Sequence, residues 1–167
     1  SIYWHMVSKL LLATQERYLL ALKNKADAST RGQLKEHYYE IKAGIGLYKS
    51  PDLYGAFPTD AYSHTPLDAG VKQPGLTGQV KEDVISRMGE MGLFVRNGQI
   101  VFDTSLLNEE EILSHESKFE YISLKGKSES INLKENQIAF TFCQVPFIYK
   151  FTNENSVLLT FENNEKK

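Results

Sequence analysis

The apolar residues of the N-terminal half recur at helical spacing in three stretches. Residues 3–24 are almost continuously apolar or helix-favouring and hold neither Gly nor Pro, which predicts one long helix. Turn and capping residues at 27–30 precede a second amphipathic stretch over 34–45. A third helix is predicted over 80–91, ended by Gly92. The first part of the chain is therefore predicted to be helical.

The first of these helices is apolar around most of its circumference. Leu11 and Tyr18 mark one face, whereas Leu12 and Leu20 fall on others. Such a helix needs neighbours on several sides, and the rest of the chain offers few helices to cover it. The chain also begins inside an apolar segment, so we expect a preceding part of the protein to be missing. Apolar faces left open in this way predict self-association in solution.

After Gly92 the apolar pattern changes to a period of two, which is typical of strands. Asn97-Gly98 separates the apolar runs 93–96 and 99–102, and this dipeptide favours the tight turn of a β-hairpin. Further strands are predicted at 118–124, 128–133, 137–143, 145–151 and 156–161. Short strands at this spacing predict an antiparallel β-sandwich.

The predicted fold class is therefore α+β, with helices followed by an antiparallel β-sandwich. The expected division is a helical part over 1–92, a sandwich over 93–162 and a tail at 163–167. The helical part contains a long stretch without period at 48–76, which is rich in proline and aromatic residues. Ordered loops of this length are usually functional, so Tyr62 and His64 are candidate site residues. A packed, satisfied ring is the commoner role for such a histidine, and both roles stay open.

Composition narrows the function classes. The 167 residues carry a formal net charge of −2 and no basic block, which gives no electrostatic footprint for nucleic acid. No apolar run reaches the roughly 18 residues that a membrane span needs. No metal-binding signature is present, so we expect no metal site. The single cysteine, Cys143, lies in an apolar strand-like run and is predicted to be a buried, inert thiol.

The start of the third helix is a candidate anion site. Thr77 and Gly78 stand at its first turn, where unpaired N–H groups and the positive end of the helix dipole favour an anion. A plain capping role for Thr77 explains the same residues. The carboxylates Glu82 and Asp83 follow, but the sequence gives no reason for either to act as an acid or a base.

Taken in order, these pieces resemble the C-terminal end of the inverting glycoside phosphorylases, the family of cellobiose and chitobiose phosphorylases. The resemblance rests on Ile2-Tyr3-Trp4-His5, on Thr77-Gly78 and on the step through Gly92 into the strands. It implies that the helices are a remnant of an (α/α)6 barrel. The family's His and Thr-Gly positions help to hold the phosphate that attacks the sugar.

The resemblance implies a fragment of a phosphorylase or glycoside hydrolase that is inactive alone, because the general acid lies upstream of this chain. Phosphate or an attacking water would lie near His5, Thr77, Gly78 and Gln79. We further predict that Tyr62, His64 and Glu82 contact the substrate, an oligosaccharide or disaccharide. No cofactor is implied beyond inorganic phosphate as a co-substrate, and a phosphorylase would be cytoplasmic. The alternative is a non-catalytic β-sandwich module for binding or assembly, with a helical stalk.

Overall fold

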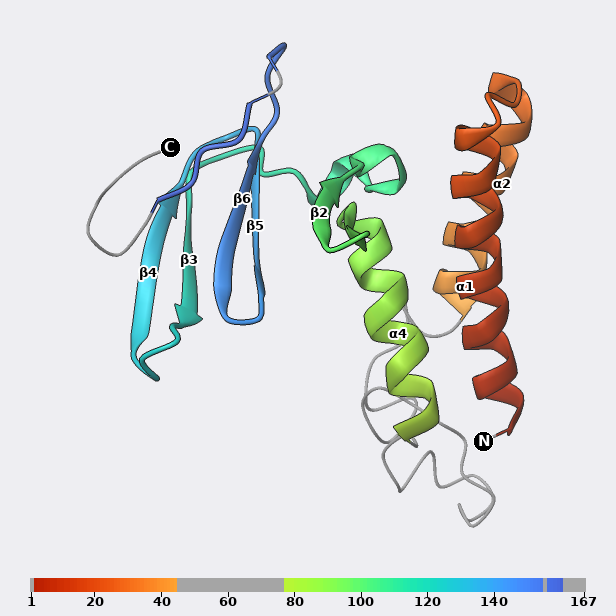
Figure 1. The fold of residues 1–167 in the computed structure, drawn as a ribbon, viewed down its shortest axis with the longest axis horizontal. Helices are drawn as coiled ribbons and strands as arrows, with labels where there is room; N and C mark the ends of the chain where they lie inside the picture. The colour runs from red at the N-terminus through yellow and green to blue at the C-terminus, as the bar shows by residue number, and fades with distance from the viewer. Residues whose placement is uncertain (1, 45–76, 155, 161–167) are drawn as a thin grey trace. The chain divides into compact units, whose positions relative to one another are not determined.

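The computed structural model describes residues 2–44, 77–154 and 156–160, without the side chains of residues 2–5 and 77–80 (Figure 1). The chain forms two compact units, residues 1–107 and residues 108–167. Helices come first and antiparallel strands follow, which confirms the α+β class. The expected division after residue 92 differs from this boundary, because the first hairpin packs with the helices.

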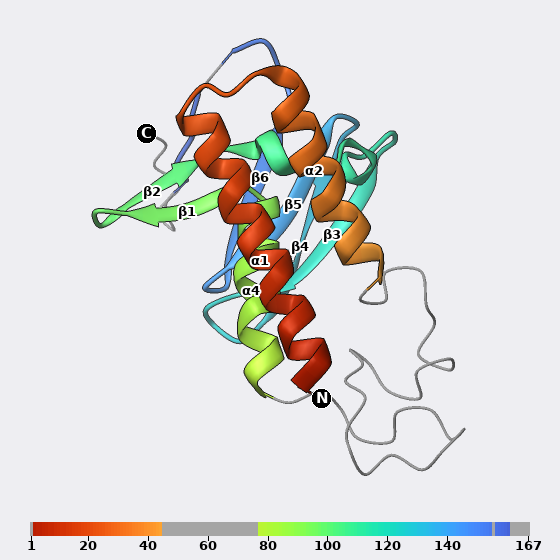
Figure 2. The same cartoon turned by 90° about the vertical axis from the view of Figure 1, so that its right-hand side faces the viewer.

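Three helices form the body of the first unit. They are α1 (Ile2–Lys23), α2 (Ala28–Lys42) and α4 (Thr77–Glu90), which confirms the three predicted helices with small shifts at their ends. The short connection after α1 turns α2 back along it, so the two helices are antiparallel. Figures 1 and 2 show that α4 runs in the same direction as α1, with both amino-terminal ends at one end of the unit.

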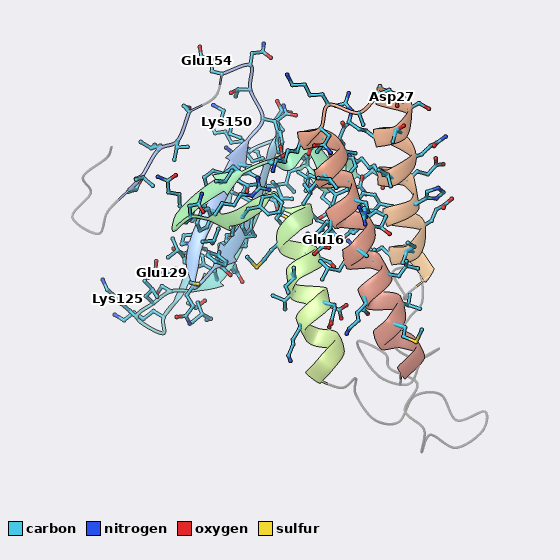
Figure 3. All side chains as sticks on the ribbon, turned by 45° about the vertical axis from the view of Figure 1, so that its right-hand side comes forward. Glu16, Asp27, Lys125, Glu129, Lys150 and Glu154 are labelled. Atoms are coloured by element: carbon cyan, nitrogen blue, oxygen red, sulfur yellow. The ribbon has the colours of Figure 1, made fainter. Side chains whose placement is uncertain are left out.

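The turn between α1 and α2 is held by an N-cap. Asp27 lies at this turn (Figure 3), where its carboxylate accepts hydrogen bonds from the Thr30 backbone N–H, at 2.9 Å, and from the Thr30 hydroxyl, at 2.6 Å. These bonds satisfy one of the unpaired donors of the first helical turn, as the sequence predicted. The same bonds stabilise the charged carboxylate and lower the pKa of Asp27 below its usual value.

We therefore expect Asp27→Ala to destabilise the first unit at neutral pH. The contribution of a carboxylate with a lowered pKa is present above its unfolded-state pKa and is lost as the pH falls through the folded-state value. The unfolding curves of Asp27→Ala and the parent should thus converge in acid, when urea unfolding is followed by circular dichroism. Asp27→Asn caps equally well and serves as the control. If the difference in stability between the parent and Asp27→Ala stayed constant through the acid range, the charged Asp27 carboxylate would not be the stabilising cap.

The core of the first unit lies between α1, α2 and the turn that follows the first hairpin. Its buried residues are Leu11 and Tyr18 from α1, Tyr38 from α2 and Leu106. The partly buried Leu19 and Leu34 pack around them. One face of α1 is therefore covered within this unit. On the rest of α1, Met6 and Leu10 remain 63% and 54% exposed.

The first hairpin consists of β1 (Leu93–Arg96) and β2 (Gln99–Phe102), in the register that the sequence predicted. Asn97 and Gly98 form its turn with φ values of 52° and 75°, the conformation that favours these two residues. A short 3-10 turn, η2 (Thr104–Leu106), follows the hairpin and delivers Leu106 to the core.

The second unit consists of two further hairpins, each a separate two-stranded antiparallel sheet. The strands are β3 (Ser117–Ile122), β4 (Ser128–Leu133), β5 (Gln137–Phe142) and β6 (Val145–Lys150). The 3-10 turn η3 (Glu109–Glu111) precedes them. Four predicted strands are thus confirmed. The strand predicted at 156–161 is not, because residues 156–159 form no strand and Thr160 makes only an isolated bridge.

Aromatic residues concentrate on one face of the β5–β6 hairpin. The register pairs Phe140 with Phe147, and their rings stack with centroids 5.5 Å apart. Tyr149 lies on the same face, opposite the buried Ile138. Burial raises the pKa of Tyr149 to about 12, so its hydroxyl stays neutral. This face is therefore the inner face of the unit.

The prediction that Cys143 is a buried thiol is wrong. Its thiol is exposed, because Cys143 and Gln144 form the two-residue turn between β5 and β6, with φ values of 51° and 62°. The apolar run continues across this position in sequence. The pairing of Phe142 with Val145, however, places Cys143 at the tip of the hairpin, where no inner face exists.

Candidate functional site

The residues predicted to bind phosphate lie on the two parallel helices. His5 is in the first turns of α1, and Thr77, Gly78 and Gln79 open α4. Their backbones are described and their side chains are not. Tyr62 and His64 lie outside the described residues. Of the predicted site residues, Glu82 alone has a described side chain, and it is half-buried on α4.

Buried polar side chains join α1 to α4 at two places. The side chain of Gln15 on α1 is buried, and its Nε2 donates a hydrogen bond of 2.8 Å to the carbonyl oxygen of Ser86 on α4. Gly89, one turn further along α4, lies directly against the Gln15 amide. We call this contact of Gln15 with Ser86 and Gly89 the helix lock.

A second polar contact lies nearer the amino-terminal ends. Ser8 on α1 is completely buried, and Asp83 on α4 lies near it. Burial raises the pKa of Asp83, the neighbouring Glu82 carboxylate raises it further, and the Ser8 hydroxyl acts in the opposite direction. The sequence could not rank the carboxylates of this region. The structure distinguishes Asp83 as one that holds its proton to a higher pH.

These two contacts fix how the helix ends correspond. The number of residues that separates Ser8 from Gln15 on α1 is nearly the same as the number that separates Asp83 from Gly89 on α4. Two parallel helices that touch at both places must have such equal spacings. One further turn towards the amino termini, roughly 5 Å along the axis, reaches His5 on one helix and Gln79 on the other. The backbones that carry the predicted site residues therefore lie at the same end of adjacent helices.

A buried ion-pair cluster joins the opposite end of α4 to α2. Glu90 is almost completely buried, and its Oε2 lies 2.6 Å from both the Lys42 ammonium and the Arg87 guanidinium. Tyr38 donates a hydrogen bond of 2.5 Å to Glu90 Oε1. Burial and the charge of Glu90 raise the pKa of Tyr38, which therefore stays a neutral donor. Because every oxygen of Glu90 is occupied, we assign the cluster a structural role.

The η2 turn is held by side chains from α1 and α2. Tyr18 donates to the Ser105 carbonyl at 3.0 Å, and Tyr39 donates to the Leu106 carbonyl at 2.7 Å. Lys35 donates to the carbonyls of Ser105 and Leu107, at 2.9 and 3.0 Å. The positive ammonium suits these unpaired carbonyls at the end of a helical turn. The η2 turn is thereby fixed to the helices.

Two kinds of site have no support among the described residues. No group of three or more His, Cys, Asp and Glu side chains in this part of the chain is arranged to hold a metal ion. None of the described helices combines the length and the hydrophobicity that crossing a membrane requires.

Comparison with known proteins gives no match to this chain, either among protein-family models or among curated proteins.

Sequence reasoning missed the helix lock and the Glu90 cluster, although a partial signal was present. On α4, Asp83, Ser86 and Glu90 recur at helical spacing, and on α1 Ser8 and Gln15 do the same. A polar stripe on each of two helices, at positions where α1 is otherwise apolar, indicates a polar contact between them. The sequence does not say which stripe meets which.

Proposed function

We propose that this chain is the C-terminal part of a carbohydrate-active enzyme that cleaves glycosidic bonds with inversion. The observation that carries the proposal is the parallel pairing of α1 and α4, with the amino-terminal ends of both helices at one end of the unit (Figure 2). In this reading the three helices belong to an (α/α)6 barrel and the strands to a β-sandwich.

Two adjacent helix amino termini suit an anionic ligand. Each presents unpaired backbone N–H groups and the positive end of a helix dipole, so an anion there needs no strongly basic surface. His5, Thr77 and Gly78 would hold the attacking phosphate, with Gln79 beside them. Tyr62 and His64 would contact the sugar.

The proposed reaction needs two groups on opposite faces of the sugar. A general acid, carried by another part of the protein, protonates the leaving oxygen as the glycosidic C–O bond breaks. Phosphate forms the new C–O bond from the opposite face and gives a sugar 1-phosphate. In a hydrolase, a water would take its place and a carboxylate such as Glu82 would accept the water's proton.

The exposed apolar residues of the helices agree with a covered position in a larger protein. Met6, Leu10 and Leu20 on α1 are more than two-fifths exposed, as are Val84 and Ile85 on α4. Helices in the wall of a barrel contact neighbours on both sides, so their apolar residues extend around more of the surface than one partner covers. A barrel would bury these residues.

The test is turnover of disaccharides by the full-length protein, with and without inorganic phosphate. We expect a sugar 1-phosphate that forms only when phosphate is present. His5→Ala should abolish most of this activity, whereas His115→Ala, at an exposed position in the second unit, should retain it. Hydrolysis independent of phosphate would select the hydrolase. Absence of turnover under both conditions would reject the enzyme and favour the non-catalytic module.

A further inference from the structure

We propose that Gln15 and Gly89 are positioning residues, which set the axial register of α1 against α4 and thereby the geometry of the helix ends that carry His5 and Thr77. The consequence for catalysis rests on the proposed function. The register itself does not.

The contacts of Gln15 place its amide directly against the backbone of α4. Its amide is buried, donates to the Ser86 carbonyl at 2.8 Å and lies 3.5 Å from the Tyr38 hydroxyl. A Cβ atom at Gly89 would overlap this amide. A side chain at residue 89 would therefore push Gln15 out of its place or move one helix along the other.

Glycine at this position is otherwise unfavourable. Residue 89 lies inside an α-helix, where glycine costs conformational entropy on folding and alanine is preferred. Gly32 in α2 has the same cost, but nothing lies within 4 Å of a Cβ atom placed there. Close approach of another side chain thus explains the glycine at 89 and not the one at 32.

The lock acts at a distance because helices are stiff. At a rise of about 1.5 Å per residue, Gln15 lies roughly 15 Å from His5 along α1, and Gly89 lies roughly 18 Å from Thr77 along α4. Since the helices are parallel, a slide at the lock reaches both ends almost unchanged. Misplacement of a ligand group by about 1 Å can lower the rate by about 100-fold.

The first experiment measures the register directly. Spin labels are placed at the exposed positions Lys23 and Lys81, which lie far apart along the helix axis, so that an axial slide changes their separation directly. The labels are introduced in a Cys143→Ser background, and their separation is determined by electron–electron double resonance. Gly89→Ala should shift or broaden the distance distribution, and Gly32→Ala should leave it unchanged. The double variant Gln15→Ala/Gly89→Ala, which makes room for the added methyl group, should restore a narrow distribution.

The second experiment measures turnover by the full-length protein. Gly89→Ala should raise the KM for phosphate about tenfold or more, while Gly32→Ala keeps the parent value. The Gln15→Ala/Gly89→Ala protein should have a KM for phosphate close to the parent value. A merely structural role would lower the amount of folded protein without changing KM.

The outcomes separate this inference from the proposed function. If the parent protein shows no turnover, the proposed function fails and the label distances alone decide the register. An unchanged distance in Gly89→Ala, or a double variant that recovers nothing, overturns the lock. Should Gly89→Ala fail to fold, Gln15→Ala alone serves instead, because it leaves the space of the amide beside Gly89 unfilled, whereas the double variant fills it with a methyl group. A distribution for Gln15→Ala as narrow as the parent's would also overturn the lock.

Discussion

Replacing Lys42 and Arg87 together by methionine should lower the free energy of unfolding of the first unit by about 3–5 kcal/mol. Both cations lie 2.6 Å from the same Glu90 oxygen, and the Glu90 side chain is almost completely buried. Either cation alone still neutralises the carboxylate, so each single replacement should cost only about 1 kcal/mol. Without both, the carboxylate is buried beside a neutral Tyr38 hydroxyl and its charge is uncompensated.

The control is to remove the buried charge itself. Adding Glu90→Leu to the double variant should recover about 2 kcal/mol or more, because a buried ion cluster can be replaced by apolar side chains with little loss. Adding Glu16→Leu instead changes an exposed carboxylate on α1 (Figure 3) and should recover nothing. The unfolding free energy of each variant is measured by urea unfolding, followed by the circular dichroism signal of the helices and by Trp4 fluorescence. If the losses of the Lys42 and Arg87 single variants add up to the loss of the double variant, the two cations do not share the neutralisation of Glu90.

Local patterns in the sequence were sufficient to predict most elements. The helix over 3–24 follows from an uninterrupted run of helix-favouring residues, and the Asp27 cap and the Asn97-Gly98 turn each have a local physical cause. Cys143 shows where such reasoning fails. Alternation predicted a strand through this residue, but only the pairing of β5 with β6 decides where the strand ends.

The contacts around the candidate site were harder to predict because they join distant segments. Gln15 and Ser86 are 71 residues apart, and Tyr38 and Glu90 are 52 residues apart. Glu90 in the last turn of a helix has the sequence context of a solvated residue, and only α2 packing against it brings Tyr38 and Lys42 to its oxygens. That His5 and Thr77 begin helices was predictable, whereas the parallel pairing of those helices was not.

Gly92→Ala should be the most damaging single methyl addition among the described glycines, with an expected loss of about 3 kcal/mol or more in unfolding free energy. Gly92 has a φ of +70°, which alone costs a non-glycine residue about 1–2 kcal/mol. A Cβ atom there would also overlap the carbonyl of Asp103, which is backbone and cannot rotate away. The Asp103 N–H donates to the Gly92 carbonyl at 2.8 Å, so the two segments cannot separate without losing this bond.

Gly98→Ala is the matched control, because Gly98 has a φ of +75° but nothing lies within 4 Å of a Cβ atom built on it. It should cost about 1–2 kcal/mol, the conformational part alone. The difference between the two variants in urea unfolding therefore measures the close approach of Asp103 to the end of α4. That approach matters beyond the turn itself, since Asp103 also accepts a hydrogen bond from the Ser105 N–H at 3.1 Å and so begins η2, which carries Leu106 into the core. Equal losses in the two variants would show that the segment after β2 yields easily and does not fix the end of α4.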